Sequence, residues 1–229
     1  VSKAGLVVIC VPRHFLEAGY ETPNRPCILL LHGFPELAYS WRKNMLPLAS
    51  HGFHVIAPDQ RGYGRTTGWA DGYDIDLTAF GILNLVRDIV ELVTVLGYRQ
   101  VQAIVGHDSG VQVAATAALI RPDLFRSLVL MSAPYPGPPM RKLGAEQEIT
   151  AFQEDPIHRA LGELPRPRKH YQLYYSTRQA DHDLCSAPQG LHSFLRAYFH
   201  YKSADWNGNI PVPLREWTAE EAAKMPTDY

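Results

Sequence analysis

Cysteine is scarce in this sequence, and charges of one sign never gather into long runs. The three cysteines, Cys10, Cys27 and Cys185, predict neither a disulfide framework nor a Cys/His metal site, and we expect buried, reduced thiols in a cytoplasmic protein. The 22 basic and 23 acidic side chains include no run of five like charges, so neither nucleic acid nor a membrane surface is expected as a partner. Chemistry on a small molecule is favoured.

Long hydrophobic runs are missing as well. No apolar stretch reaches the roughly 20 residues that a transmembrane helix needs. The apolar piece at residues 6–11 is followed by Pro12 and has no small-residue cleavage site, so we predict a strand there and no signal peptide. With 46% hydrophobic residues in a chain of 229, one large core, or a core with an appended subdomain, can be buried.

Strand and helix patterns alternate up to about Ala133. Short apolar runs rich in β-branched residues predict strands at residues 6–11, 27–31, 54–57, 102–105 and 127–131. Helices are predicted at residues 37–50, 82–96 and 109–120. Asp76 is expected to cap the start of the second helix and Gly97 its end. This rhythm is typical of an α/β fold, a mostly parallel sheet with helices on both faces.

The pattern changes after Ala133. Residues 134–139, PYPGPP, form a boundary rich in proline and glycine. Beyond it, short helical or irregular pieces rich in His, Tyr, Arg and Pro replace the alternation. We therefore predict an α/β core at residues 1–133 and a second, mainly helical subdomain at residues 134–229.

The segment GHDSG follows the fourth of these strands and precedes an Ala-rich helix. In a nucleophile elbow the reactive residue occupies a strained strand-to-helix turn, and the residues two before and two after it must be small. Gly106 and Gly110 meet this requirement around Asp108, whereas a frame centred on Ser109 would place larger residues there. Asp108 is the predicted nucleophile. Taken alone, the motif is equally compatible with an aspartate that only caps the helix.

The segment HGFPE, residues 32–36, also follows a predicted strand and reaches the same edge of the sheet, where open α/β sheets bind ligands. The amides of Phe34 and Ser109 are the predicted donors of an oxyanion hole. His32 is expected to orient the loop by hydrogen bonding and not to act as a base. The predicted oxyanion and substrate-binding residues are therefore Phe34, Ser109, His32 and Pro35. A third turn, DQRGYG, is expected to be held by an Asp59–Arg61 pair.

In this order and on these strands, HGFPE, DQRGYG and GHDSG resemble the α/β-hydrolase fold superfamily, most closely its epoxide hydrolases, with haloalkane and fluoroacetate dehalogenases as relatives. The resemblance covers residues 27–135 and continues in HYQLYYSTRQ, which resembles the segment of the helical cap that carries an epoxide-activating tyrosine. It implies this role for Tyr171, and no cofactor. The alternative is a Tyr-rich helix that packs on the core, which we favour for Tyr174 and Tyr175.

A carboxylate nucleophile suits an epoxide. With an ordinary pKa of about 4, Asp108 is ionised at neutral pH and needs no activating base. Its attack on a ring carbon gives an alkyl ester, and a tyrosine protonates the departing oxygen. Ser109 stands where dehalogenases carry Trp or Arg, which counts against the dehalogenase alternative, although many epoxide hydrolases also have Trp there. A non-catalytic binding protein on the same scaffold is the remaining alternative.

The resemblance places the general base, its acid partner and a second tyrosine after the cap. Nothing after residue 134 returns to strand-helix alternation, and no cap histidine is assigned the base role. We therefore expect a core that is incomplete at its C-terminus, with the missing portion as a separate segment or chain, and residues 127–131 as an exposed sheet edge. The expected substrate is a small epoxide; the sequence carries no indication of oligomeric state.

Overall fold

The computed structural model describes residues 14–137, 156–210 and 212–225 of the chain. The chain divides into two compact units, Val1–Met140 and Arg141–Tyr229. The strand predicted at residues 6–11 lies outside the described residues, and the domain boundary expected after residue 133 stays a prediction.

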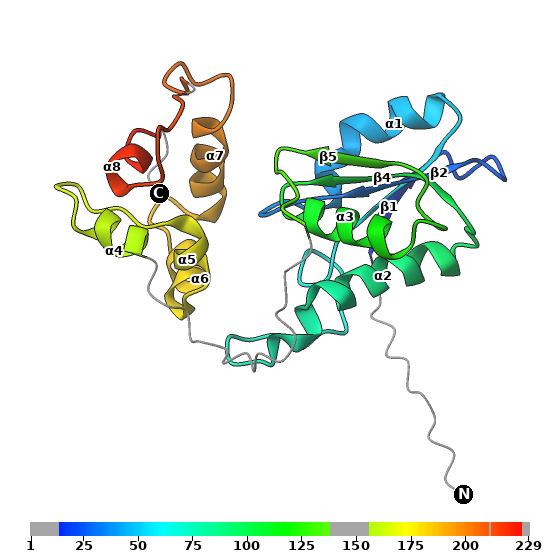
Figure 1. Ribbon diagram of the computed structural model, residues 1–229, viewed down its shortest axis with the longest axis horizontal. Coiled ribbons are helices and arrows are strands. Elements are labelled where there is room, and N and C mark those ends of the chain that lie inside the picture. Colours follow the sequence, from blue (N-terminus) through cyan, green and yellow to red (C-terminus); the bar gives the residue numbers. More distant parts are fainter. Residues whose placement is uncertain (1–13, 138–155, 211, 226–229) are drawn as a thin grey trace, which may run out of the picture. The chain divides into compact units, whose positions relative to one another are not determined.

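A five-stranded sheet with the order β1-β3-β2-β4-β5 forms the centre of the first unit (Figure 1). The strands are β1 (Phe15–Ala18), β2 (Cys27–Leu31), β3 (His54–Pro58), β4 (Val101–His107) and β5 (Leu128–Met131). β1 runs antiparallel to β3, and the other neighbouring strands run parallel. The predicted α/β fold with a mostly parallel sheet is confirmed. Strand β1 was not predicted, because its segment FLEA is too short and too polar to stand out.

Helices cover both faces of this sheet. The 3-10 helix η1 (Ala38–Trp41) and α1 (Arg42–Ser50) lie on one face, and α2 (Ile82–Val95) and α3 (Gly110–Ile120) lie on the other (Figure 1). Successive β2 side chains alternate between the faces: Leu29 and Leu31 pack in the cluster with α2 and α3, while Leu30 packs with α1. This two-sided burial explains why β2 reads as a continuous apolar run.

The start of α2 differs from the prediction. Asp76 does not cap α2; its Oδ1 atom accepts a hydrogen bond from the Thr78 amide at 2.8 Å and so caps the 3-10 helix η2 (Leu77–Phe80). A short 3-10 turn therefore separates the expected cap from the helix, and Gly81 occupies the cap position of α2. Gly97 follows the end of α2 with φ +86°, a conformation that glycine adopts readily, as predicted.

The described part of the second unit is helical. Its helices are α4 (Pro156–Gly162), α5 (Tyr171–Tyr175), α6 (Arg178–Cys185), α7 (Leu191–Tyr201) and α8 (Ala219–Ala222). Leu161 of α4 packs against Ala219 and Ala222 of α8, with Ile157 and Met225 beside them. This small cluster joins α4 to α8, the first and last helices in the described part of the unit. No helix in the described residues is long and apolar enough to cross a membrane.

Strand β5 lies at the edge of the sheet with its side chains open to solvent. Its residues Leu128, Val129, Leu130 and Met131 are between 38% and 44% exposed. The expectation of an exposed apolar edge at this strand is therefore confirmed.

The two cysteines among the described residues differ in exposure, and Cys10 lies outside these residues. Cys27 of β2 is fully buried, as expected. Cys185 at the end of α6 is exposed, so the expectation of buried thiols is wrong for this residue. It ends a helix whose sequence, RQADHDLC, is mostly polar, and only Ala180 of this helix is buried.

Candidate active site

Asp108 lies in the turn between β4 and α3, in a backbone conformation that residues other than glycine rarely adopt. Its φ is +52°. The turn is held from both sides, because the Asp108 amide donates to the Met131 carbonyl oxygen of β5 at 3.1 Å, and the Asp108 carbonyl oxygen accepts from the Val111 amide at 3.0 Å. Such strain persists where the surrounding structure determines the conformation, and it is frequent at functional sites.

The glycines on either side of this turn are required by close packing. A Cβ atom on Gly106 would lie 2.5 Å from the Gly110 carbonyl oxygen, and one on Gly110 would lie 2.7 Å from the Leu31 carbonyl oxygen. Strand, turn and helix therefore approach closely only with glycine at positions 106 and 110. This geometry supports the frame of the motif that is centred on Asp108.

One carboxylate oxygen of Asp108 rests on two backbone amides. Oδ1 accepts hydrogen bonds from the Ser109 amide at 2.7 Å and the Phe34 amide at 2.9 Å. We call these two donors the amide cradle. Gly33 permits the approach, since a Cβ atom there would lie 2.4 Å from the Asp108 Cβ. If a nucleophile attacks the carboxyl carbon of an Asp108 ester, the oxygen in the cradle carries the developing negative charge.

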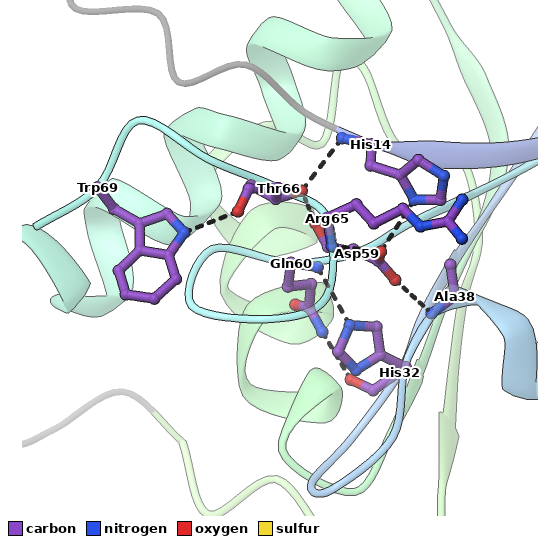
Figure 2. A network of polar contacts seen from close by, with 8 residues as sticks. All are labelled: His14, His32, Ala38, Asp59, Gln60, Arg65, Thr66 and Trp69. Atoms are coloured by element: carbon purple, nitrogen blue, oxygen red, sulfur yellow. Dashed lines mark hydrogen bonds and ion pairs between the residues drawn. The ribbon is translucent and has the colours of Figure 1, made fainter. Parts of the chain in front are cut away.

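The His32 side chain holds the turn that supplies Phe34 in place by hydrogen bonding. The His32 ring is fully buried; its Nδ1 lies 2.9 Å from the Gly33 carbonyl oxygen, and its Nε2 accepts from the Gln60 amide at 3.1 Å (Figure 2). Burial lowers the pKa of this imidazole. The ring thus joins two turns and leaves no surface for a substrate. Pro35 follows Phe34 through a cis peptide bond and is half-buried.

Asp59 is a buried junction that joins several parts of the first unit. Its Oδ1 accepts from the Ala38 amide at 2.9 Å, and its Oδ2 accepts from the Arg65 amide at 3.1 Å and lies 2.9 Å from His14 Nδ1 (Figure 2). Burial alone would raise the pKa of Asp59, but the two amides and the His14 ring together hold it below its usual value. This carboxylate therefore holds together the three segments that contain His14, Ala38 and Arg65.

Arg61 does not pair with Asp59, so that prediction is wrong. Its guanidinium forms a bidentate pair with Asp88 of α2, with Nε–Oδ2 and Nη2–Oδ1 distances of 2.7 and 2.6 Å. The Asp59 carboxylate is already occupied by backbone amides, whereas Asp88 is buried and requires a cation. Both side chains of the ion pair are nearly inaccessible. The Arg61–Asp88 ion pair therefore fixes the turn DQRGYG to α2.

Two further features near Asp108 were not predicted from the sequence. The Tyr63 ring packs edge-on against His32, with centroids 4.9 Å apart. Burial raises the pKa of Tyr63, a hydrogen bond with the Ser109 side chain lowers it in part, and the Asp108 charge raises it. In the residue before Asp108, His107 Nδ1 lies 2.9 Å from the Glu36 carboxylate. The only sequence signal for these two contacts is that Tyr63 belongs to the motif DQRGYG and Glu36 to the motif HGFPE.

Tyr171 belongs to the second unit, where it begins α5. Its ring stacks on His170 and meets Tyr175 edge-on, with centroid distances of 5.5 and 6.3 Å. The Tyr174 hydroxyl donates to Asp183, and this bond raises the pKa of Tyr174 to about 12. Of the predicted site residues, the structure therefore brings together those of the first unit, and the role of Tyr171 stays a prediction. No cluster of metal-binding side chains occurs in the described residues.

Comparison with known proteins places these features in a family. Residues 26–156, more than half of the chain, match the family model described as the alpha/beta hydrolase fold. Epoxide hydrolase 3 of Siraitia grosvenorii is 44% identical over 110 residues, which are 48% of this chain and 33% of that protein. Epoxide hydrolase A of Mycobacterium tuberculosis is 40% identical over 119 residues, 52% of this chain and 34% of the relative. The chain spans about a third of the length of these relatives.

Solved structures extend the similarity to the helical unit. A mutant of potato epoxide hydrolase matches with 30% sequence identity and a TM-score of 0.63, over 96% of this chain and 60% of that protein. A laboratory-evolved variant of the same enzyme matches with 31% identity and a TM-score of 0.64, over the same shares of the two chains.

Proposed function

The chain belongs to the alpha/beta hydrolase fold family, and from this membership we propose that it performs epoxide hydrolysis through a covalent ester on Asp108. The observation that carries the proposal is the amide cradle: one oxygen of a strained, turn-borne carboxylate accepts two backbone amides, from Phe34 and Ser109. The names of the sequence relatives and of the matched solved structures support the reaction class.

The first step is an attack by Asp108 Oδ2 on a ring carbon of the epoxide. Among the residues that the structure describes, none donates a hydrogen bond to Oδ2, while Oδ1 is held by the cradle. One lone pair of Oδ2 forms the new C–O bond as the strained ring C–O bond breaks. The departing oxygen takes up the negative charge, and we propose that the Tyr171 hydroxyl gives it a proton.

The second step is hydrolysis of the alkyl ester. Water adds to the carboxyl carbon of Asp108, Oδ1 becomes the oxyanion, and the bond from this carbon to Oδ2 then breaks, so the diol leaves with Oδ2. The amides of Phe34 and Ser109 stabilise the oxyanion, and loss of one such donor typically costs about 3 kcal/mol. This step needs a general base, a role that we assign to no described residue. Ester formation is therefore the step that the identified residues explain.

Mass spectrometry of the protein treated with styrene oxide tests the proposal. We expect one added epoxide mass on the peptide that contains residues 104–115, and none in Asp108→Asn. Asp123→Asn is the matched control, because Asp123 is an exposed aspartate that pairs with Arg121. An adduct of equal yield in Asp108→Asn would overturn the proposal. Bromide release from 1-bromobutane, without any reaction of styrene oxide, would instead indicate a dehalogenase.

Labelled water tests the same ester by a second route. If the diol takes its oxygen from Asp108, the product of the first turnover in heavy-oxygen water contains no label, and the label enters Asp108. A first-turnover diol that already carries the label would mean direct attack by water and would exclude Asp108 as the nucleophile.

The role of Tyr171 has its own test. Removal of a general acid typically slows a reaction by about 100-fold or more, so Tyr171→Phe is expected to lower the rate of Asp108 alkylation by that factor. Tyr20→Phe, at an exposed position of the first unit, is the control. An alkylation rate in Tyr171→Phe equal to that of the control would remove Tyr171 from the mechanism and leave the Asp108 assignment intact.

A further inference from the structure

The hydroxyl of Ser109 is not used in the way that is usual for a serine at the start of a helix. Ser109 occupies the cap position of α3, where a serine oxygen commonly accepts a hydrogen bond from an amide of the first turn. That bond goes with extended backbone at the capping residue, whereas Ser109 has φ -62° and ψ -25°, in the helical region, and its side chain makes no capping bond. The hydroxyl therefore serves another partner.

This partner is Tyr63, in the turn DQRGYG. A hydrogen bond joins the Ser109 side chain to the Tyr63 hydroxyl, and it lowers the pKa of Tyr63, as a bond donated by the serine does. The backbone amide of the same serine donates to Asp108 Oδ1 at 2.7 Å. Ser109 thus holds the carboxylate with its amide while its side chain is held by Tyr63.

The backbone of Tyr63 is fixed within its own turn. Its amide donates to the Gln60 carbonyl oxygen at 3.0 Å, and its carbonyl oxygen accepts from the Thr66 amide at 3.3 Å. The next residue is packed tightly, because a Cβ atom on Gly64 would lie 2.3 Å from Asp59 Oδ2. Tyr63 is therefore a fixed point to which a neighbouring segment can be attached.

The Tyr63 ring also connects Ser109 to His32. The two rings meet edge-on with centroids 4.9 Å apart, and His32 is fully buried. His32 Nδ1 lies 2.9 Å from the carbonyl oxygen of Gly33, the residue before Phe34. One buried imidazole is thus linked to both donors of the amide cradle, to Phe34 along the backbone and to Ser109 through Tyr63.

We infer that Tyr63 is a positioning residue that keeps the Ser109 amide aligned on Asp108 Oδ1. Asp108 has a φ of +52°, so the peptide that follows it belongs to a strained turn. A small rotation of that peptide would carry the amide away from the carboxylate oxygen, and the bond from the Ser109 side chain to Tyr63 opposes this rotation. The inference rests on the proposed function, since it explains how one donor of the cradle is held during reaction at Asp108.

Removal of either hydroxyl tests the link in the full chain. Tyr63→Phe keeps the ring beside His32 but deletes the partner of Ser109, whereas Ser109→Ala keeps the amide but deletes the side-chain donor. Each is expected to lower the maximal rate of Asp108 alkylation by styrene oxide about fivefold, the effect of one ordinary hydrogen bond, and to leave the half-saturating concentration unchanged. Tyr20→Phe, at an exposed position, is the control. A rate in Tyr63→Phe equal to that of the control would overturn the inference.

The double variant distinguishes one shared interaction from two independent effects. If Tyr63 acts through Ser109, Tyr63→Phe/Ser109→Ala should react no more slowly than either single variant, because all three proteins have lost the same bond. Losses that multiply, to about 25-fold in the double variant, would mean that Tyr63 acts by a different route and would overturn the inference.

NMR of the backbone amides tests the alignment without any reaction. An amide proton that is bonded to a carboxylate resonates at low field. We expect Tyr63→Phe to move the Ser109 amide proton upfield, by more than the other amides of the first unit, and Tyr20→Phe to leave it in place. A Ser109 resonance that moves no more than those amides would overturn the inference, even with Asp108 alkylated normally. If styrene oxide fails to alkylate Asp108 in the wild type, the proposed function fails, but a selective shift at Ser109 still supports the link to Tyr63.

Discussion

The backbone amide of Phe34 donates a hydrogen bond to Asp108 Oδ1 over 2.9 Å, between residues 74 positions apart in the sequence. The contact joins the turn after β2 to the turn after β4, two strands that are neighbours in the sheet. In the proposed mechanism, it determines which carboxylate oxygen the protein stabilises and which one attacks the epoxide. The same donor serves both proposed steps, because the oxygen that it binds does not leave with the product.

Gly106→Ala should disrupt the turn that bears Asp108. The new methyl group would lie 2.5 Å from the Gly110 carbonyl oxygen and 2.8 Å from the Val111 Cα, both of them backbone atoms. Overpacking of this kind costs about 1–3 kcal/mol, and we expect a loss of stability in the upper part of this range together with slower alkylation of Asp108. Urea denaturation measures the first and mass spectrometry the second. Gly162→Ala, where a Cβ atom meets nothing within 4 Å, should be neutral.

Asp59→Asn should destabilise the first unit at neutral pH and flatten its response to acid. The pKa of Asp59 is held below its usual value, so its charge contributes stability above the unfolded-state pKa of about 4. That contribution is lost as the pH falls through the lower, folded-state value. Urea unfolding between pH 7 and pH 3 should therefore show a steeper decline for the wild type than for Asp59→Asn. Asp71→Asn, at an exposed position, should follow the wild-type curve.

Arg61→Met should be strongly destabilising, because it leaves Asp88 as a buried charge without its bidentate partner. Breaking a buried ion pair from one side costs about 3–5 kcal/mol. The double variant Arg61→Met/Asp88→Leu should recover most of this loss, since both charges are then gone. Urea denaturation of the three proteins measures the effect. A mild change in Arg61→Met, equal to that of the exposed control Arg87→Met, would mean that the pair adds little.

The cysteines should report unfolding of the core by their reactivity. Cys27 is fully buried and burial raises its pKa to about 12, so almost no thiolate exists at pH 8, whereas Cys185 is exposed. In a Cys10→Ser background, a maleimide should modify Cys185 within minutes and Cys27 only in urea. Peptide mass spectrometry identifies the site. Modification of Cys27 in native buffer at the rate of Cys185 would contradict its burial in β2.

The regular elements of the first unit were predictable because their signals are local. The apolar run of β2 and the apolar spacing in α2 each follow from one stretch of sequence, and the flanking glycines identified Asp108 in the same way. Each of these patterns arises from packing within a single strand, helix or turn. A reader of the sequence needs no knowledge of the rest of the fold to find them.

The contacts that failed prediction are decided by distant parts of the chain. Arg61 and Asp88 are 27 positions apart, and only the packing of α2 brings them together. Proximity in sequence favoured Asp59 instead, but its carboxylate is occupied by the amides of Ala38 and Arg65. Tyr63 was overlooked for the same reason, since its contact with His32 depends on how two turns meet. Long-range polar partners of this kind leave no periodic pattern.

The division of the chain into two units has a consequence for protein engineering. The amide cradle and the Asp59 junction are built within Val1–Met140, whereas Tyr171 and the rest of α5 belong to Arg141–Tyr229. Under the proposed function, the nucleophile and the proposed acid are encoded in separate, contiguous stretches of the gene. A library that randomises the second stretch therefore leaves Asp108 and its amide cradle unaltered.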